Sequence, residues 1–455
     1  MNGTRRRASS GARLLVVALV GSSLVGGGAR ADAGDGERPH ARAVIADDFR
    51  EVEILGARTA AWCGTPAQAD RAPNAVAGYP VHWVYAIPAD GEDRVDATAG
   101  LMQADAEAID AWWRREDSLR TVRNDLAQFP CGLQLDLSAL RLPQPAAQLP
   151  ADARFAAIFG ALRAAGFNSD LTKYVVYYDG PASDTRTCGE GGGLRSGIGL
   201  AVVYLRACTS VSTAAVAAHE LLHTLGAVSS VAPNACPPAS GGHTCDNELD
   251  LMYPSIDSSP LETRLLDPGR DDYYGHGRSW PDAREAPWLV QLDRQAPFTL
   301  SVTGPGRVVA SVPGLDCTRP CTTTWNRDTQ LVLRATPSPG AKLVRWGGAC
   351  GGSATCSVVI GQAGATSALF APASYRLDIR VVGRGGVTSG RPGIACQPRC
   401  AGSFPSYVPL RLTAKPAPGW KLTAWAGACR GSRAICTVPM TRASSVRATF
   451  ARAGR

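Results

Sequence analysis

The chain has 455 residues, of which 45% are hydrophobic and 19% charged, and its formal net charge is +8. This composition is typical of globular proteins and excludes wholesale disorder, and the length predicts about three domains. Lysine and arginine are spread along the chain without a basic helix or an aromatic-rich basic patch, so we expect no nucleic acid partner.

The N-terminus has the three parts of a secretory signal peptide. An arginine-rich start is followed by a short apolar stretch at 14–25 and by Ala29-Arg30-Ala31, which fits a small-x-small cleavage site. The apolar stretch is short for a bilayer span, so an uncleaved membrane anchor is the less favoured alternative, and no other stretch is apolar enough. We therefore expect residues 1–31 to be a signal peptide and the mature protein to be secreted, free or associated with the cell surface, with no stable membrane span. The fourteen cysteines, an even number, then indicate disulfides.

The segment 32–296 mixes helical and strand patterns, which predicts an α/β domain. The expected helices are 99–115 and 151–165, and the expected strands are 82–87, 174–178 and 198–205. Pairing its cysteines in chain order gives Cys63–Cys131, Cys188–Cys208 and Cys236–Cys245. A free Cys63 thiol that blocks a metal in a proenzyme is a less favoured alternative, because it would leave another cysteine unpaired.

One helix carries the motif on which the functional prediction depends. The sequence TAAVAAHELLHTLG predicts a helix over 214–225, with Ser212 or Thr213 as its N-cap and Gly226 ending it. His219 and His223 lie on one face, one turn apart, so both imidazoles can bind one zinc ion. Glu220 completes H-E-x-x-H and is placed to accept a proton from water. The alternative is a helix whose histidines only pack or form hydrogen bonds.

The motif and its surroundings resemble the metzincin metalloproteases. Residues 219–226 read H-E-x-x-H-x-x-G, and Leu251-Met252-Tyr253-Pro254 is similar to the methionine turn of that family. The resemblance implies a third histidine ligand where this chain has Ser229. We expect an insertion to move that ligand to His243, in a loop that a Cys236–Cys245 bridge would close. The resemblance also implies that Met252 forms a hydrophobic base beneath the metal.

Several assignments around this site stay open. The other candidates for the third zinc ligand are Asp246, Asp250, Glu248 and His276. Tyr253 either stabilises an oxyanion or only packs. A second set of carboxylates, on Asp267, Asp271 and Asp272, forms either a calcium site or a solvated acidic turn. By analogy with the family, the strand 198–205 is expected to be the sheet edge onto which a peptide binds.

The last third of the chain contains an internal repeat. Cys317, Cys321, Gly340, Trp346 and Cys350 recur at identical spacings as Cys396, Cys400, Gly419, Trp425 and Cys429. Alternating runs such as 331–335 and 410–414 predict strands, so we expect two small all-β modules at 297–373 and 374–455, each with its own disulfides. The C-x3-C, L-x-A-x-P-x-x-G, W-x-G-A-C and A-x-F motifs resemble divergent internalin-type B repeats, which implies attachment or spacing.

Taken together, the residue patterns and the resemblance to the metzincins imply a metzincin-like catalytic domain followed by two disulfide-bearing β modules. The expected function is a secreted zinc endopeptidase acting on protein or peptide substrates, with Glu220 as general base and His219, His223 and His243 as ligands of one Zn2+. The repeats are expected to bind a cell-surface or wall polymer. Two alternatives remain: an inactive adhesion protein with a protease-like domain, and a zinc amidase acting on cell-wall polymer.

Overall fold

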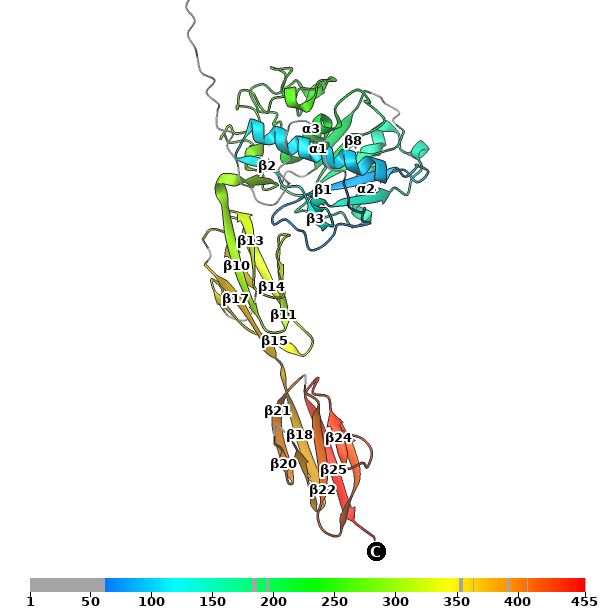
Figure 1. The fold of residues 1–455 in the computed structure, drawn as a ribbon, viewed down its shortest axis with the longest axis vertical. Helices are drawn as coiled ribbons and strands as arrows, with labels where there is room; N and C mark the ends of the chain where they lie inside the picture. The colour runs from blue at the N-terminus through cyan, green and yellow to red at the C-terminus, as the bar shows by residue number, and fades with distance from the viewer. Residues whose placement is uncertain are drawn as a thin grey trace, which may run out of the picture. The chain divides into compact units, whose positions relative to one another are not determined.

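The computed structural model describes residues 62–181, 186–193, 196–351, 355–362, 364–390, 393–406 and 408–454. The predicted signal peptide lies outside these residues. The described chain is mostly β-structure with few helices, as Figure 1 shows. Its α-helices are α1 (Val95–Glu116), α2 (Ala151–Ala164) and α3 (Thr213–Leu225). Within the described ranges, no helix has the length and the apolar character that crossing a bilayer requires.

A five-stranded mixed sheet organises the N-terminal part. Its strand order is β5-β1-β6-β8-β7. The bounds are β1 (Val81–Ile87), β5 (Leu137–Arg141), β6 (Lys173–Tyr178), β7 (Gly189–Gly193) and β8 (Gly199–Tyr204). The first four strands of that order run parallel, whereas β7 runs antiparallel to β8 at the edge. Two short antiparallel pairs complete this part: β2 (Arg120–Val122) with β9 (Leu289–Gln291), which are far apart in the sequence, and the hairpin of β3 (Leu126–Phe129) with β4 (Gly132–Leu135).

Helices cover both faces of this sheet. Side chains alternate along a strand, so Val175 and Tyr177 of β6 enter one core together with residues of α1 and α3. Tyr174 and Val176 enter a second core, on the opposite face, together with Ile158 of α2. Burial on both faces explains why β1, β6 and β8 are continuous hydrophobic runs in the sequence.

The sheet corrects one prediction and confirms others. The predicted helices and strands of this part are present, with ends shifted by a few residues. The strand expected at 198–205 is β8, but β8 lies between β6 and β7 and is not an edge. The edge is β7, whose sequence Gly-Glu-Gly-Gly-Gly has low strand propensity and gave no strand signal.

Two β-sandwiches follow, and they share one topology. In the first, the sheets are β13-β10-β17-β15 and β12-β11-β14-β16; in the second, they are β21-β18-β25-β23 and β20-β19-β22-β24. The first has β10 (Gln295–Thr303), β11 (Gly306–Ala310), β12 (Asp316–Cys317), β13 (Cys321–Asn326), β14 (Gln330–Pro337), β15 (Ala341–Gly348), β16 (Cys356–Val359) and β17 (Thr366–Pro372). The second has β18 (Ser374–Val382), β19 (Gly385–Ser389), β20 (Ala395–Cys396), β21 (Arg399–Pro405), β22 (Leu410–Pro416), β23 (Trp420–Gly427), β24 (Ile435–Val438) and β25 (Ser444–Arg452). The matching strand orders confirm two copies of one β module.

All fourteen cysteines form disulfides. The pairs predicted in the N-terminal part, Cys63–Cys131, Cys188–Cys208 and Cys236–Cys245, are present. The modules pair their cysteines consecutively, as Cys317–Cys321, Cys350–Cys356, Cys396–Cys400 and Cys429–Cys436. Because Cys63 is bonded, the alternative of a metal-blocking thiol is wrong.

Candidate metal centre and active site

Helix α3 places two imidazoles and a carboxylate within five consecutive residues. Its start is capped by Ser212, whose Oγ accepts a hydrogen bond from the Ala215 N–H. Its end is fixed by Gly226, which has φ 98° and whose N–H donates to the carbonyl of His223. The helix is therefore held at both ends, and His219 and His223 project from the same face, as the sequence predicted.

A disulfide-closed loop brings His243 to this pair. Cys236 and Cys245 are bonded, and the Cys236 N–H donates to the carbonyl of His243 (2.8 Å). The loop also contacts the end of α3, because the Val228 N–H donates to the carbonyl of Gly242 (3.3 Å). The ring centroid of His243 lies 5.2 Å from that of His219 and 4.9 Å from that of His223. The structure thus gathers the three histidines that the sequence singled out.

Hydrogen bonds orient all three rings in the same sense. The Nδ1 atoms of His219, His223 and His243 donate to the carbonyls of Leu251 (2.6 Å), Ala227 (3.2 Å) and Ser240 (3.0 Å), respectively. A carbonyl can only accept, so each Nδ1 carries the proton and each Nε2 is free as a ligand.

The spacing of the nitrogens fits a tetrahedral ion. The Nε2 atoms of His219 and His223 are 3.2 Å apart. Two nitrogens bound to zinc at 2.0–2.1 Å with a tetrahedral angle lie about 3.3 Å from each other. Three imidazole nitrogens that leave a fourth position open are a donor set typical of catalytic zinc. The residues present therefore fit this metal.

Burial keeps the imidazoles neutral. His219 is 5% exposed, and burial, with the charge of nearby His223, holds its pKa well below the usual value. Burial, with the charge of His243, lowers the pKa of His223 to about 4. A metal binds the neutral form of an imidazole, so this environment favours a ligand role over a charged surface role.

The side chain of Glu220 projects from α3 towards the edge strand β7. A Cβ built on Gly189 would be 2.7 Å from Glu220 Oε1, and one built on Gly191 would be 2.5 Å from the carbonyl oxygen of Glu220. Only glycine permits this close approach. Glu220 is 6% exposed, and burial, together with the charge of Glu190, raises its pKa well above the usual value. A carboxylate in such surroundings has an increased affinity for a proton.

The outer edge of β7 carries backbone groups that do not pair with β8. The Tyr204 N–H of β8 donates to the carbonyl of Cys188, so alternate residues of β7 point their backbone groups toward β8. The groups of Gly189, Gly191 and Gly193 therefore face outward, and among the described residues β7 pairs only with β8. The edge strand that passes Glu220 is therefore β7 and not the strand predicted at 198–205.

Asp250 is a structural residue of the site and does not face the three imidazoles. One carboxylate oxygen accepts from the Tyr273 hydroxyl (2.6 Å) and the Met252 N–H (2.9 Å), and the other accepts from Thr244 Oγ1 (3.0 Å). It thus joins the His243 loop to the turn at 251–252, which supplies the acceptor for His219. Met252 is fully buried within the main core.

The other predicted candidates lie apart from the histidines. Asp246 and Glu248 are exposed, and neither belongs to the group of converging ligand atoms. His276 stacks on Trp280 at 5.0 Å and donates from Nε2 to the Pro281 carbonyl. Ser229, at the position of the family's third histidine, accepts the Val231 N–H in a turn. The Tyr253 hydroxyl makes no hydrogen bond to another described residue.

The acidic cluster at 267–272 is already occupied by hydrogen-bond donors. The carboxylate of Asp267 accepts the backbone N–H groups of Asp272, Tyr273 and Tyr274. The carboxylate of Asp272 accepts both the N–H and the side-chain amide of Asn234. These hydrogen bonds organise a turn. Carboxylate oxygens of Asp267, Asp271 and Asp272 also lie within 4.8 Å of one another, so the calcium site stays a prediction beside the turn.

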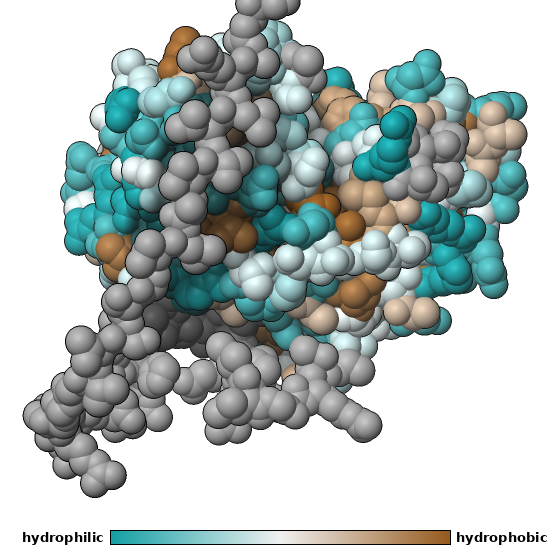
Figure 2. Space-filling model, turned by 90° about the horizontal axis from the view of Figure 1, so that it is seen from above, coloured by the Kyte–Doolittle hydropathy of each residue, from teal (hydrophilic) through white to brown (hydrophobic). Residues whose placement is uncertain are grey.

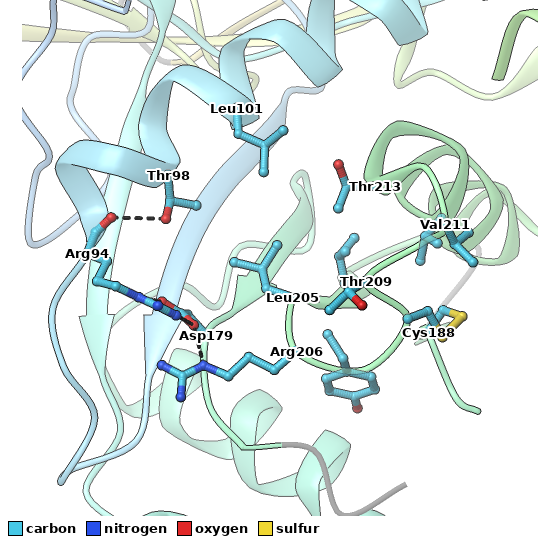
Figure 3. Close-up of a pocket in the computed structure, with 14 residues that line it drawn as sticks. Arg94, Thr98, Leu101, Asp179, Cys188, Leu205, Arg206, Thr209, Val211 and Thr213 are labelled. Carbon is cyan, nitrogen blue, oxygen red and sulfur yellow. Dashed lines mark hydrogen bonds and ion pairs between the residues drawn. A yellow bond between two sulfur atoms is a disulfide. The ribbon is translucent and has the colours of Figure 1, made fainter. Parts of the chain in front are cut away.

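A pocket of about 260 Å³ lies at the start of α3 (Figure 3). On one side, Arg94 and Arg206 converge on Asp179, with an Nε–O distance of 2.8 Å from each guanidinium. Their hydrogen bonds outweigh the effect of burial and lower the pKa of Asp179, so the cluster carries one net positive charge. Val216, which also lines the pocket, is one helical turn before Glu220 on α3. Figure 2 shows that hydrophobic residues on the viewed face form small separate groups.

Comparisons with known proteins identify part of the C-terminal region. The family model described as a divergent InlB B-repeat domain matches residues 388–454, within the second predicted module. No curated protein matches the chain.

Solved structures give only distant similarities. Metalloproteinase-II from Bacteroides fragilis is 16% identical over 42% of this chain and 52% of its own, with a TM-score of 0.23. OgpA from Akkermansia muciniphila is 12% identical over 89% of this chain and 100% of its own, with a TM-score of 0.27. A major pilin from Streptococcus pyogenes is 8% identical over 35% of this chain and 97% of its own, with a TM-score of 0.19. Scores this low do not establish a shared fold.

Proposed function

We propose that this protein is a secreted, zinc-dependent endopeptidase of metzincin type. The observation that carries the proposal is the convergence of three imidazoles whose Nδ1 atoms are all bound to carbonyls, with Glu220 beside them. His219, His223 and His243 would hold the zinc ion, which would supply the Lewis acidity that this hydrolysis needs. Secretion is supported by the complete pairing of the cysteines.

The chain's own groups account for substrate binding and proton transfer. An extended peptide pairs with the free edge of β7, which places a peptide bond beside Glu220. Glu220 takes a proton from the water that attacks the carbonyl carbon. It then gives the proton to the amide nitrogen as the C–N bond breaks, so no proton is gained or lost overall. The buried position of Glu220 favours this role, because burial raises the affinity of the carboxylate for a proton.

The test is the pair wild type and Glu220→Ala, each assayed for zinc and for cleavage of casein. We expect about one zinc per chain in both proteins. We expect cleavage by the wild type only, because the variant keeps the ligands and loses the proton acceptor. A loss of about 100-fold or more is typical for removal of a general base. A wild type that fails to bind zinc after reconstitution would support the inactive adhesion protein. Release of products from peptidoglycan but not from casein would support the wall-polymer amidase.

A further inference from the structure

Three arginines stand in line across one sheet of the second β module. Arg399 of β21 and Arg447 of β25 are both register neighbours of Arg380 on the central strand β18. Neighbouring strands are about 4.8 Å apart, and directly paired residues point to the same face of a sheet. All three side chains are exposed. We call this set, Arg380, Arg399 and Arg447, the arginine row.

Within the described parts of the chain, no carboxylate forms an ion pair with the arginine row. None of its three side chains forms a hydrogen bond or an ion pair with another described residue. The acidic residue nearest in sequence, Asp378, is bound by Arg376, with an Nη2–Oδ1 distance of 2.7 Å. Like charges directly opposite each other on neighbouring strands are destabilising. The row therefore costs the module stability, which requires a reason other than folding.

The first β module is an internal control for this inference. Its sheet β13-β10-β17-β15 has the strand order of β21-β18-β25-β23. The places of Arg380 and Arg447 are taken there by Ser301 and Ser367, which are register neighbours in the same way. The same fold thus forms with small neutral residues at these places, so the arginines are not a structural requirement of the module.

The surface beside the row is hollowed. Arg380, Arg399 and Arg447 line a depression of about 380 Å³ together with the small residues Ala426, Gly427 and Ser445 and with Asp378. Small side chains beside long arginines leave room for a ligand between the guanidinium groups. The hollow and the charge lie on the same strands, which Figure 1 labels β18, β21 and β25.

We propose that the arginine row binds an anionic polysaccharide. Guanidinium groups form paired hydrogen bonds with carboxylate and sulfate groups, and a polymer with closely spaced negative groups engages all three arginines at once. A polysaccharide is the polyanion that an extracellular protein meets most directly, so the inference rests on the proposed secretion but not on peptide hydrolysis. It assigns to the second module the surface-polymer role that was expected of the repeats as a pair.

The experiment compares three full-length proteins: wild type, R380S/R399S/R447S, and R334S/R411S/R430S. The last variant removes the same charge from exposed arginines outside the row. Binding is measured to heparin, which is sulfated, to polygalacturonate, which is carboxylated, and to neutral dextran, at low and at physiological salt. We expect the row variant to bind about tenfold more weakly or worse, the control variant within about twofold of wild type, and dextran not at all.

The outcomes separate the proposal from its alternatives. Binding to only one of the two polyanions supports the proposal and identifies the charged group. The row variant should melt at the same temperature as wild type or higher, because it loses like-charge repulsion. Equal binding by the row variant, or an equal loss in the control variant, overturns the proposal. A fragment of duplex DNA that outcompetes both polysaccharides overturns the assignment of the ligand. Casein cleavage reports the proposed peptidase separately.

Discussion

At the scale of single residues, the site depends on which atoms of each side chain are already used. In each of the three histidines, Nδ1 donates a hydrogen bond to a carbonyl and Nε2 is left to bind a metal. Both carboxylate oxygens of Asp250, in contrast, accept hydrogen bonds from neighbouring groups. Residue type alone would make the histidines and Asp250 equal candidates for the zinc site, and their hydrogen bonds distinguish them.

We expect His243→Ala to weaken zinc binding by more than about 100-fold, because it removes a ligand from a three-histidine site. Asp246→Ala and His276→Ala are matched controls in the same region and should bind zinc like the wild type. Competition with a chromophoric chelator measures all three affinities. A loss in the Asp246 variant with none in the His243 variant would refute the assignment of the third ligand.

At the scale of elements, the contact between β7 and α3 depends on glycine at alternate positions. Gly191→Ala should reduce peptidase activity strongly and lower stability, because the new Cβ would meet the Glu220 carbonyl at 2.5 Å and His223 Cβ at 2.9 Å. Gly192→Ala is the control, since its Cβ would meet only Phe155 at 3.6 Å, an ordinary contact. Peptidase activity and the melting temperature of the two variants are the measurements that test this contact. Equal behaviour of both would mean that β7 does not lie against the active-site helix.

A buried carboxylate on α1 gives the fold a pH dependence. Asp105 accepts hydrogen bonds from Tyr177 of β6 and from Thr213 at the start of α3, and burial raises its pKa to about 6. Between pH 4 and 6 the folded chain holds a proton that the unfolded chain has released, so this group lowers stability as pH rises.

Asp105→Asn removes this titration. Relative to wild type, the variant should gain up to about 3 kcal/mol in the free energy of unfolding when pH is raised from 4 to 7. Denaturant unfolding at several pH values measures the difference. A difference between variant and wild type that does not change with pH would contradict the role given to Asp105.

Local signals in the sequence sufficed for α3 and failed for β7. The apolar run, the cap at Ser212 and Gly226 all act within a few residues, so the helix and its H-E-x-x-H motif could be predicted. The strand β7 is held by β8 on one side and by α3 on its face, and its glycines are needed for that packing. Strand propensity gave no sign of this packing, because glycine has a low propensity for strands and the contact with α3 is made by a later segment of the chain.

At the scale of the molecule, the N-terminal part and each β module have hydrophobic cores of their own. The core of the second β module consists only of residues of that module, including Leu412 and Trp425. The repeat in the sequence predicted this module and its twin, but not which cysteines pair. Four cysteines allow three pairings, and the consecutive one follows from strand positions that the sequence does not contain.

Leu412→Ala should destabilise the second module by about 2–5 kcal/mol, because it leaves a cavity in a closed core. Peptide hydrolysis and zinc content should stay at wild-type levels. The control Val408→Ala, at a position that is 38% exposed, should cost less than about 0.5 kcal/mol. Calorimetry and a peptidase assay of both variants test this. A loss of activity in the Leu412 variant would show that the module supports the site.

The central claim is that three imidazoles bind one zinc ion. X-ray absorption at the zinc edge, on protein reconstituted with one equivalent of zinc, tests it most directly. We expect three histidine nitrogens and one oxygen, all at about 2.0–2.1 Å, in a tetrahedral arrangement. A spectrum with two or fewer histidine ligands, or with sulfur in the first shell, would contradict it.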